Sequence, residues 1–272
     1  MLNIKVLAGK NYGPTSRLIR NCLQKFQPIE NNASRGKIWI TKSASNVWGI
    51  DYVVRWGNIS PLGYSPKLEV NSAEFVRLCG KKTFSNFMQD YSIKNLSVVE
   101  FEVMSKIPEE FPVILRKTLA GYQGKGIKIL STAKEFEDNI NPKFHWSKVL
   151  KADAEFRVHV LGGKVKRIFK KIPKSDTIEN VEIPIRNSKD YRYSLRSDSN
   201  EFTRMLRIIE EVSEVLPHAK NSFFAADVGL CYDSGGYIIY EINTAPGLNT
   251  PSAEIYARWL WEKFQEAEKT LE

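Results

Sequence analysis

The sequence predicts a protein of the α/β (α+β) class in which two or three subdomains share one cleft. Three observations predict it. The chain has 272 residues, more than a typical single domain. Strand-like runs alternate with amphipathic helical stretches in its first part, and strand-turn-strand patterns dominate its second part. The composition, 42% apolar and 26% charged residues, is that of a globular protein.

An N-terminal α/β domain is expected over residues 1–75. Its helix is expected at residues 15–26, where apolar residues recur with helical spacing. Its strands are expected at residues 4–7, 37–41 and 51–56. The run Arg55-Trp-Gly-Asn58 ends the last of them in a turn.

A central subdomain is expected over residues 76–147. It follows a helix at residues 72–78 and begins with a short helix before residue 94. Strands are expected at residues 96–103, 112–116 and 126–130, the last two joined as a hairpin by a long glycine-rich loop. Thr132 is expected to cap a helix over residues 132–140, which Asn141 and Pro142 end.

A C-terminal domain of antiparallel strands is expected over residues 148–272. The first strands are joined by a Gly162-Gly163 hairpin turn. Residues 174–198 are polar and are expected to form a loop, and helices are expected at residues 201–216 and 253–267. The strands are expected at residues 148–150, 155–161, 164–172, 223–230 and 237–242.

Composition and charge exclude some functions and favour others. No segment approaches the roughly 18 apolar residues of a membrane span, so no membrane partner is expected. Three widely spaced cysteines, without a Cys-x-x-Cys pattern, favour the reducing cytoplasm and offer no zinc site. The net charge of +9 favours an acidic partner such as a nucleotide, an acidic peptide or a nucleic acid. The basic run at residues 164–174 lacks an aromatic array, so no motif indicates nucleic-acid binding, and the run fits a solvated strand face equally well.

The strand at residues 237–242 carries the strongest chemical signal. Glu241 and Asn243 are two residues apart, so their side chains project from the same face of a strand. Carboxylate and amide oxygens are the ligands that Mg²⁺ prefers. By itself the pair also fits an exposed edge strand that ends in a turn.

Asp227 lies among Phe, Ala and Val residues in the preceding strand. An ionisable residue in such surroundings seldom stays buried without a partner or a metal. If the hairpin loop holds an odd number of residues, Asp227 lies opposite Glu241 on one face, and a metal relieves the repulsion between the two carboxylates. An even loop would place the two on opposite faces.

A glycine-rich loop suggests an anion site. It runs Arg116-Lys-Thr-Leu-Ala-Gly-Tyr-Gln-Gly-Lys-Gly126 between two strands. Glycines let backbone amides approach phosphate closely, and Arg116 or Lys117 supplies fixed positive charge. The loop is neither a P-loop nor a dinucleotide fingerprint, because no Gly-Lys-Ser/Thr ending is present and a strand follows it. The other interpretation is a flexible hairpin tip.

Residues 148–160 contain a strand that stops, turns and restarts. Such a segment can present backbone groups to a base while Arg157 reaches a phosphate. Glu155, Arg157 and His159 share one strand face, so they fit a surface charge ladder as well.

Taken together, these motifs resemble the ATP-grasp carboxylate–amine ligases, in particular the branch similar to RimK and its phage-encoded relatives. The resemblance is clear over residues 110–250. Its most specific part is the Glu-x-Asn-x-x-Pro-Gly run with the upstream Asp. The matching runs are Pro112-Val-Ile-Leu-Arg-Lys117, Gly121-Tyr-Gln-Gly-Lys-Gly126, Glu155-Phe-Arg157, Ile185-Arg-Asn187, Ala226-Asp-Val-Gly229 and Glu241-Ile-Asn-Thr-Ala-Pro-Gly-Leu248.

The resemblance implies an architecture and a set of roles. The N-terminal domain would be pre-ATP-grasp-like, residues 76–147 would form a lid, and ATP would lie between that lid and the C-terminal domain. Asp227, Glu241 and Asn243 would hold magnesium, two ions being expected and Mn²⁺ an alternative. Arg157, Arg186 and Lys170 would act on the reacting groups, with Lys171 as an alternative to Lys170. The nucleotide would contact Arg116 or Lys117, Gly121, Gln123, Gly124, Lys125, Gly126, Lys148, Val149, Leu150, Lys151 and Glu155.

The activity that the resemblance implies is ATP-dependent formation of an amide bond. A substrate carboxylate would attack the γ-phosphate, and an amine would displace phosphate from the acyl phosphate. The positive charge suits an acidic peptide or protein as a substrate. Two other functions remain open: a non-catalytic module that binds ATP or nucleic acid, and an ATP-dependent kinase acting on a small acid.

Overall fold

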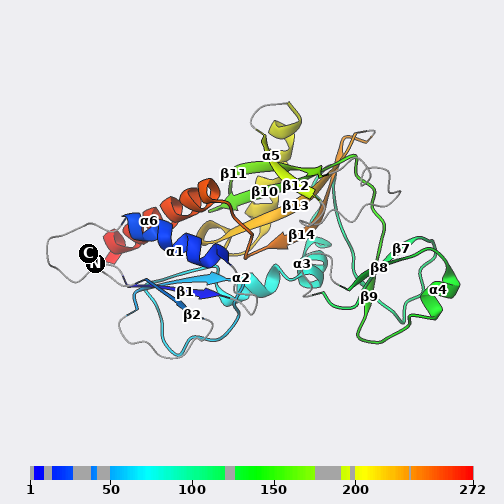
Figure 1. Cartoon of the computed structure of the whole chain (residues 1–272), viewed down its shortest axis with the longest axis horizontal. Helices are drawn as coiled ribbons and strands as arrows, with labels where there is room; N and C mark the ends of the chain where they lie inside the picture. The colour runs from blue at the N-terminus through cyan, green and yellow to red at the C-terminus, as the bar shows by residue number, and fades with distance from the viewer. Residues whose placement is uncertain are drawn as a thin grey trace.

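The computed structural model describes residues 3–8, 14–26, 38–41, 50–119, 126–174, 191–196, 200–232 and 234–271. The described strands form three sheets, of four, six and four strands. Figure 1 shows them along the long axis of the molecule, with the N-terminal sheet at one end, the six-stranded sheet in the middle and the third sheet at the other end.

The N-terminal sheet is parallel and has the strand order β2-β1-β3-β4. Parallel sheets are covered on both faces, so their strands are strongly apolar. Helices α1 (Pro14–Phe26) and α6 (Thr250–Leu271) lie side by side over one face, and Tyr256, Leu260 and Phe264 of α6 are buried in its core. The strands are β1 (Ile4–Ala8), β2 (Ile38–Thr41), β3 (Tyr52–Trp56) and β4 (Leu68–Val70).

Two short helices connect this sheet to the middle of the molecule. Helix α2 (Ala73–Leu78) begins after Ser72, whose side-chain oxygen accepts a hydrogen bond from the Phe75 amide at 3.2 Å. Helix α3 (Lys81–Met88) follows directly. Phe75 and Phe84 are buried in the central core, so both helices are fixed against the six-stranded sheet.

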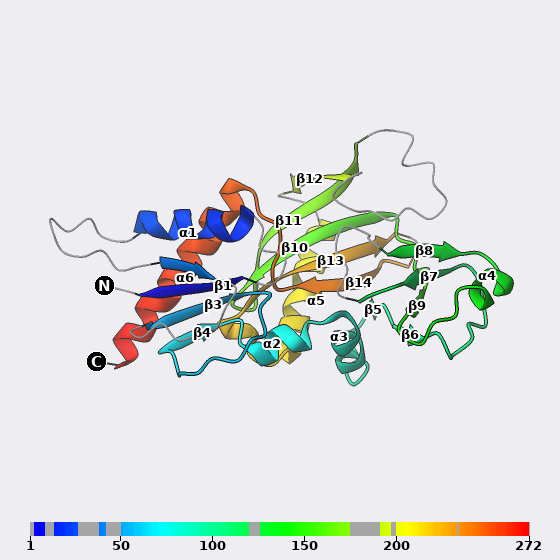
Figure 2. The same ribbon diagram turned by 60° about the horizontal axis from the view of Figure 1, so that its bottom comes forward.

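The six-stranded sheet has the order β12-β11-β10-β13-β14-β5 and is antiparallel except for the last pair. One face packs on α5 (Asn200–Val215) through residues such as Val158, Val228 and Ile239. The opposite face carries the polar residues of the candidate site, because side chains alternate along a strand. Figure 2 shows the strands in this order. They are β5 (Leu96–Val98), β10 (Ala154–Leu161), β11 (Lys164–Pro173), β12 (Tyr191–Arg196), β13 (Phe223–Cys231) and β14 (Gly236–Asn243).

The third sheet, called the lid sheet below, has the order β6-β9-β7-β8. Helix α4 (Ala133–Glu137) packs on it through Phe136, and the Thr132 side chain accepts a hydrogen bond from the Glu135 amide at 3.2 Å. Val113, Leu115 and Trp146 form the small core on that side. The strands are β6 (Glu102–Val103), β7 (Val113–Arg116), β8 (Ile127–Leu130) and β9 (His145–Lys148).

Most predicted elements are confirmed, and three differ for physical reasons. Within residues 174–198, which were expected to be a loop, residues 191–196 form β12 and pair with β11 at the sheet edge, because tertiary pairing outweighs polar composition. Residues 175–190 and 197–198 of that expected loop lie outside the described residues. The strand expected at residues 148–150 is β9, which ends at Lys148, so residues 149–153 form a linker. The strand expected at residues 96–103 is divided between two sheets as β5 and β6. None of the described helices has the length and apolar character of a membrane span.

Candidate functional site

A β-bulge in the β13–β14 hairpin brings Asp227 opposite Glu241. Cys231 pairs with Gly236, so the even-numbered loop of residues 232–235 joins the strands. The loop is therefore of the even kind, for which the sequence predicts opposite faces, and a regular ladder would have paired Asp227 with Tyr240. The register shifts between Val228 and Asp227, and Tyr240 is the extra residue. Because of this bulge, the two carboxylates are cross-strand neighbours despite the even loop.

The bulge also gives Tyr240 a role that the sequence did not indicate. Its hydroxyl donates a hydrogen bond to the Leu150 carbonyl oxygen at 3.2 Å, which ties the linker after β9 to the sheet. The ring passes over Gly229, where a Cβ would lie 2.7 Å from the Tyr240 hydroxyl oxygen. Glycine at this position is therefore required by the packing of Tyr240.

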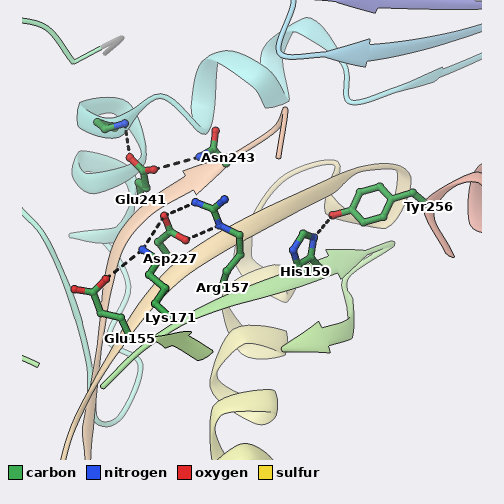
Figure 3. Close-up of polar contacts among 9 residues, drawn as sticks. Glu155, Arg157, His159, Lys171, Asp227, Glu241, Asn243 and Tyr256 are labelled. Atoms are coloured by element: carbon green, nitrogen blue, oxygen red, sulfur yellow. Dashed lines mark hydrogen bonds and ion pairs between the residues drawn. The ribbon is translucent and has the colours of Figure 1, made fainter. Parts of the chain in front are cut away.

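Asp227 is only 6% exposed and is held by two cations. The Nε and Nη2 atoms of Arg157 donate to its two oxygens, each at 2.8 Å, and the Lys171 Nζ lies 3.4 Å from Oδ2 (Figure 3). Burial alone would raise the pKa of Asp227, but Arg157 and Lys171 outweigh it and hold the pKa well below its usual range. Asp227 is thus a buried anion with its charge compensated.

Lys171, not the predicted Lys170, faces the site. Lys170 pairs with Phe156 on the face toward the α5 core, whereas Lys171 contacts Asp227 and lies 3.1 Å from Glu155. The register of the β10–β11 hairpin shifts between His159 and Val160, and Lys166 is the extra residue. A regular two-residue hairpin would have paired Lys170 with Glu155, so this shift moves Lys171 into that position.

The predicted trio of β10 is mostly shielded from solvent and does not form a surface charge ladder. The side chains of Glu155 and Arg157 are 12% and 15% exposed. His159 is buried, and its Nδ1 atom lies 2.8 Å from the Tyr256 hydroxyl oxygen of α6. Burial, helped by Arg157, lowers the pKa of His159 to about 3, so its ring is neutral. His159 therefore links the sheet to α6, while Glu155 and Arg157 belong to the site.

Glu241 and Asn243 complete the predicted oxygen set. The Asn243 amide nitrogen donates to Glu241 Oε1 at 3.2 Å, and Lys81, the first residue of α3, forms an ion pair with Oε2 (Figure 3). Lys81 is a second residue that sequence reasoning missed, since a lysine at a helix start carries no specific signal.

The donor set fits a hard cation such as Mg²⁺. Asp227 and Glu241 supply carboxylate oxygens and Asn243 an amide oxygen, the chemistry that Mg²⁺ prefers. Over the described ranges there is no group of three or more His, Cys, Asp or Glu side chains that could hold a metal. A cation bound here would take the place of the Lys81 ammonium on Glu241.

The two candidate phosphate contacts, Arg116 and Lys117, have different surroundings. The Arg116 guanidinium lies 5.4 Å from the centre of the Phe101 ring, and the Lys117 ammonium lies 6.0 Å from that of Phe144. Burial lowers the pKa of Arg116, against the attraction of Glu241. Its buried Nε atom has no hydrogen-bond partner within the described part of the chain. Arg116 is thus close enough to Glu241 for their charges to attract each other.

The linker that contains Val149, Leu150 and Lys151 borders an apolar cluster. Val99, Phe101 and Ile238 form its buried centre, and Leu119, Leu150, Ala152, Cys231 and Tyr240 pack around it. Apolar side chains beside a backbone segment suit a purine base. Gly126 ends the glycine-rich loop, called the lid loop below, with a φ of +76°. Its carbonyl oxygen accepts a hydrogen bond from the Lys117 amide at 2.9 Å.

Five of the predicted site residues lie outside the described residues. They are Gly121, Gln123, Gly124, Lys125 and Arg186.

Comparisons with known proteins identify the fold. No protein-family model and no curated protein matches the chain. Among solved structures, it is similar to the D-alanine–D-alanine ligase from Bacillus anthracis, with a TM-score of 0.67, 14% identity, and 99% of this chain and 98% of that chain covered. It is also similar to a RimK domain ATP-grasp protein from Sphaerobacter thermophilus, with a TM-score of 0.61, 14% identity and coverage of 94% and 98%. A third similar structure is the ATP-grasp ligase PsnB with a precursor variant, Mg and ADP, with a TM-score of 0.59, 12% identity and coverage of 95% and 99%. The chain therefore has the ATP-grasp fold over nearly its whole length.

Proposed function

We propose that the protein is an ATP-dependent ligase that joins a carboxylate to an amine through an acyl phosphate. The observation that carries this proposal is the placement of Asp227 opposite Glu241. Two carboxylates and an amide lie on one sheet face, with the cations Arg157 and Lys171 beside them. Such a face suits a magnesium-bound polyphosphate better than it suits a purely structural role.

The nucleotide would lie between the lid sheet and the six-stranded sheet. The base would occupy the apolar cluster beside residues 148–151, and the phosphates would extend toward Arg116 and the loop that ends at Gly126. Magnesium bound by Asp227, Glu241 and Asn243 would neutralise phosphate charge, and we propose two ions, with Mn²⁺ as a substitute. In the similar solved structures, the Bacillus anthracis ligase is complexed with ATP and PsnB with Mg and ADP.

The reaction would consist of two displacements. The substrate carboxylate attacks the γ-phosphorus and ADP leaves, which gives the acyl phosphate. The amine then attacks the acyl carbon, loses a proton and expels phosphate. Arg157 and Lys171 are fixed before substrate arrives, so they can meet negative charge as it develops without reorganising. We keep Arg186 as a further cation for this step on the strength of the motif resemblance.

The substrate class is the finer part of the proposal. The net charge of +9 favours an acidic peptide or protein as one substrate. The macrocyclase MdnC from Microcystis aeruginosa, another similar structure, is bound to a precursor peptide, which supports a peptide as one substrate. The motifs further suggest the RimK-like and phage-encoded branch. The free thiols Cys22, Cys79 and Cys231 agree with the reducing cytoplasm that we propose as its location.

The test is the dependence of ADP and phosphate release on both substrates. The protein is incubated with ATP, Mg²⁺, acidic peptides and an amino-acid pool, and products are identified by mass spectrometry. A ligase releases ADP only when carboxylate and amine are both present, and the product mass names the two. Turnover without an amine would instead indicate a kinase. ATP binding without any turnover would indicate a binding module.

A further inference from the structure

Three buried polar atoms on one face of the lid sheet have no hydrogen-bond partner among the residues that the structure describes. They are Arg116 Nε, His145 Nδ1 and Ser147 Oγ. Arg116 pairs with His145 across β7 and β9, and Ile114 pairs with Ser147, so all three side chains project from the same face. That face is opposite to the small core formed by Val113, Leu115 and Trp146. Buried polar groups are rarely left unpaired, so a ligand is expected to complete them.

The charges around this face are mostly positive. Arg116 lies on β7 and His145 beside it on β9, and the charge of Lys82 in α3 helps to lower the pKa of His145. On β6 the neighbour of His145 is the uncharged Val103, and the adjacent Glu102 forms an ion pair with Lys106. The carboxylate that influences Arg116 is Glu241, which is already paired with Lys81. The missing ligand is therefore an anion.

The position of His145 along β9 indicates which anion. Lys148, where the strand ends and the proposed base-binding linker begins, is three positions after His145. At roughly 3.3 Å per residue this distance is about 10 Å. His145 thus lies toward the phosphate end of a nucleotide whose base occupies the linker, at the same level as Arg116.

We propose that His145 binds the phosphates of the nucleotide together with Arg116 and takes up a proton when they arrive. This inference rests on the proposed ATP site. Burial and the neighbouring Lys82 lower the pKa of His145, so its ring is neutral before the nucleotide binds. A phosphate in contact with the ring favours the protonated form and offsets both effects.

The experiment compares His145→Asn with His218→Asn, the same change at an exposed histidine. His218 has a φ of +64°, a conformation that asparagine also adopts readily. Isothermal titration calorimetry with ATP, ADP and AMP in the presence of Mg²⁺ measures affinity, and buffers of different ionisation enthalpy measure proton uptake. We expect His145→Asn to weaken ATP binding by roughly 10- to 100-fold, with little change for AMP, and to abolish the proton uptake. His218→Asn should behave as the wild type.

A second variant separates a charge effect from a folding effect. His145→Arg keeps a positive group at this position, so ATP affinity should return while proton uptake stays absent. Equal ATP affinity and equal proton uptake in the wild type and His145→Asn would overturn the inference and leave the proposed ligase intact. Absence of ATP binding by the wild-type protein would overturn both.

Discussion

The two sheets that contribute to the proposed nucleotide site differ in whether their charged groups have partners. On the six-stranded sheet, Asp227 and Glu241 are each paired with at least one cation. On the lid sheet, Arg116 and His145 carry buried nitrogens for which no partner exists within the described residues. The carboxylates of the six-stranded sheet are thus paired before any ligand binds, whereas these nitrogens of the lid sheet are not.

This difference suggests a division of labour. Paired groups are held in place by their partners, so Arg157 and Lys171 keep their geometry without a substrate, which is what pre-organised charge stabilisation requires. The Tyr193 ring, whose centre lies 5.0 Å from the Arg157 guanidinium carbon, holds this group further. Unpaired groups on the lid gain most when an anion binds. The six-stranded sheet, which forms the floor of the proposed site, is thus expected to determine the turnover rate. The lid sheet is expected to determine the nucleotide affinity.

The largest effect is expected from Asp227→Asn. The change removes a metal ligand and leaves Arg157 and Lys171 without their buried carboxylate. We expect turnover to fall by roughly 10²- to 10³-fold and the free energy of unfolding by about 3–5 kcal/mol. Steady-state ADP release and urea denaturation measure the two. Asp90→Asn, at an exposed position, should change neither. Turnover within twofold of the wild type would remove Asp227 from the site.

His159, on the six-stranded sheet, extends the comparison to pH. His159 has a partner in Tyr256 and a pKa lowered to about 3, against an unfolded value of about 6.5. Below pH 6.5 the unfolded chain binds a proton that the folded chain refuses. Stability is therefore full above that pH and falls as pH drops from 6.5 toward 3, at about 1.4 kcal/mol per unit once the unfolded histidine is protonated.

The measurement is urea denaturation of the wild type and His159→Gln at several pH values. Glutamine cannot titrate, so the variant should lose much less stability than the wild type between pH 6.5 and 4, although its starting stability is lower. Asp227 adds a separate loss only below pH 4, because its pKa is depressed and its contribution is present above the unfolded value. Parallel curves for the wild type and His159→Gln would contradict the neutral His159.

How far the sequence predicts this site is clearest from two single-residue bulges. The residues Asp227, Glu241, Asn243 and Arg157 could be proposed as candidates from composition, strand alternation and motif resemblance. Whether residues of two paired strands share a face could not be predicted, because one extra residue reverses the face of every residue that follows it. The extra residue Tyr240 places Asp227 opposite Glu241 although the loop is even. The extra residue Lys166 places Lys171, and not Lys170, on the face of the site. Neither position carries a glycine or proline that would indicate a bulge.

Contacts between distant segments were equally beyond the sequence. Lys81 meets Glu241 from a helix 160 positions earlier, as the difference 241 − 81 gives, and no periodicity relates the two. The packing of α6 on the N-terminal sheet, through Tyr256 and Phe264, likewise depends on the whole topology. The strand and helix content followed from local patterns because those patterns agree with the final fold.

A smaller effect is expected at the mouth of the lid loop, where Arg116 and Lys117 were equally good candidates for phosphate. The buried Nε atom of Arg116 has no hydrogen-bond partner among the described residues, and its charge is attracted by Glu241. Lys117 instead lies over the Phe144 ring. We expect Arg116→Met to weaken ATP binding by roughly 10- to 100-fold and Lys117→Met by less than about threefold. Calorimetry with ATP and Mg²⁺ measures both. The reverse order would transfer the role to Lys117.

The smallest effect is expected from Lys81→Met. This variant is also the most direct test of the paired carboxylates on the six-stranded sheet. A metal ion and the Lys81 ammonium compete for Glu241, so removing the lysine should raise the affinity for Mn²⁺ in the absence of nucleotide by roughly 5- to 10-fold, while stability falls by about 1 kcal/mol or less. Electron paramagnetic resonance of free Mn²⁺ measures the affinity without any turnover. Lys106→Met breaks an exposed ion pair on the lid sheet and should leave it unchanged. If Lys81→Met binds Mn²⁺ no better than the wild type, the cation does not displace Lys81, and the metal would have to be held without the Glu241 oxygen that the lysine contacts.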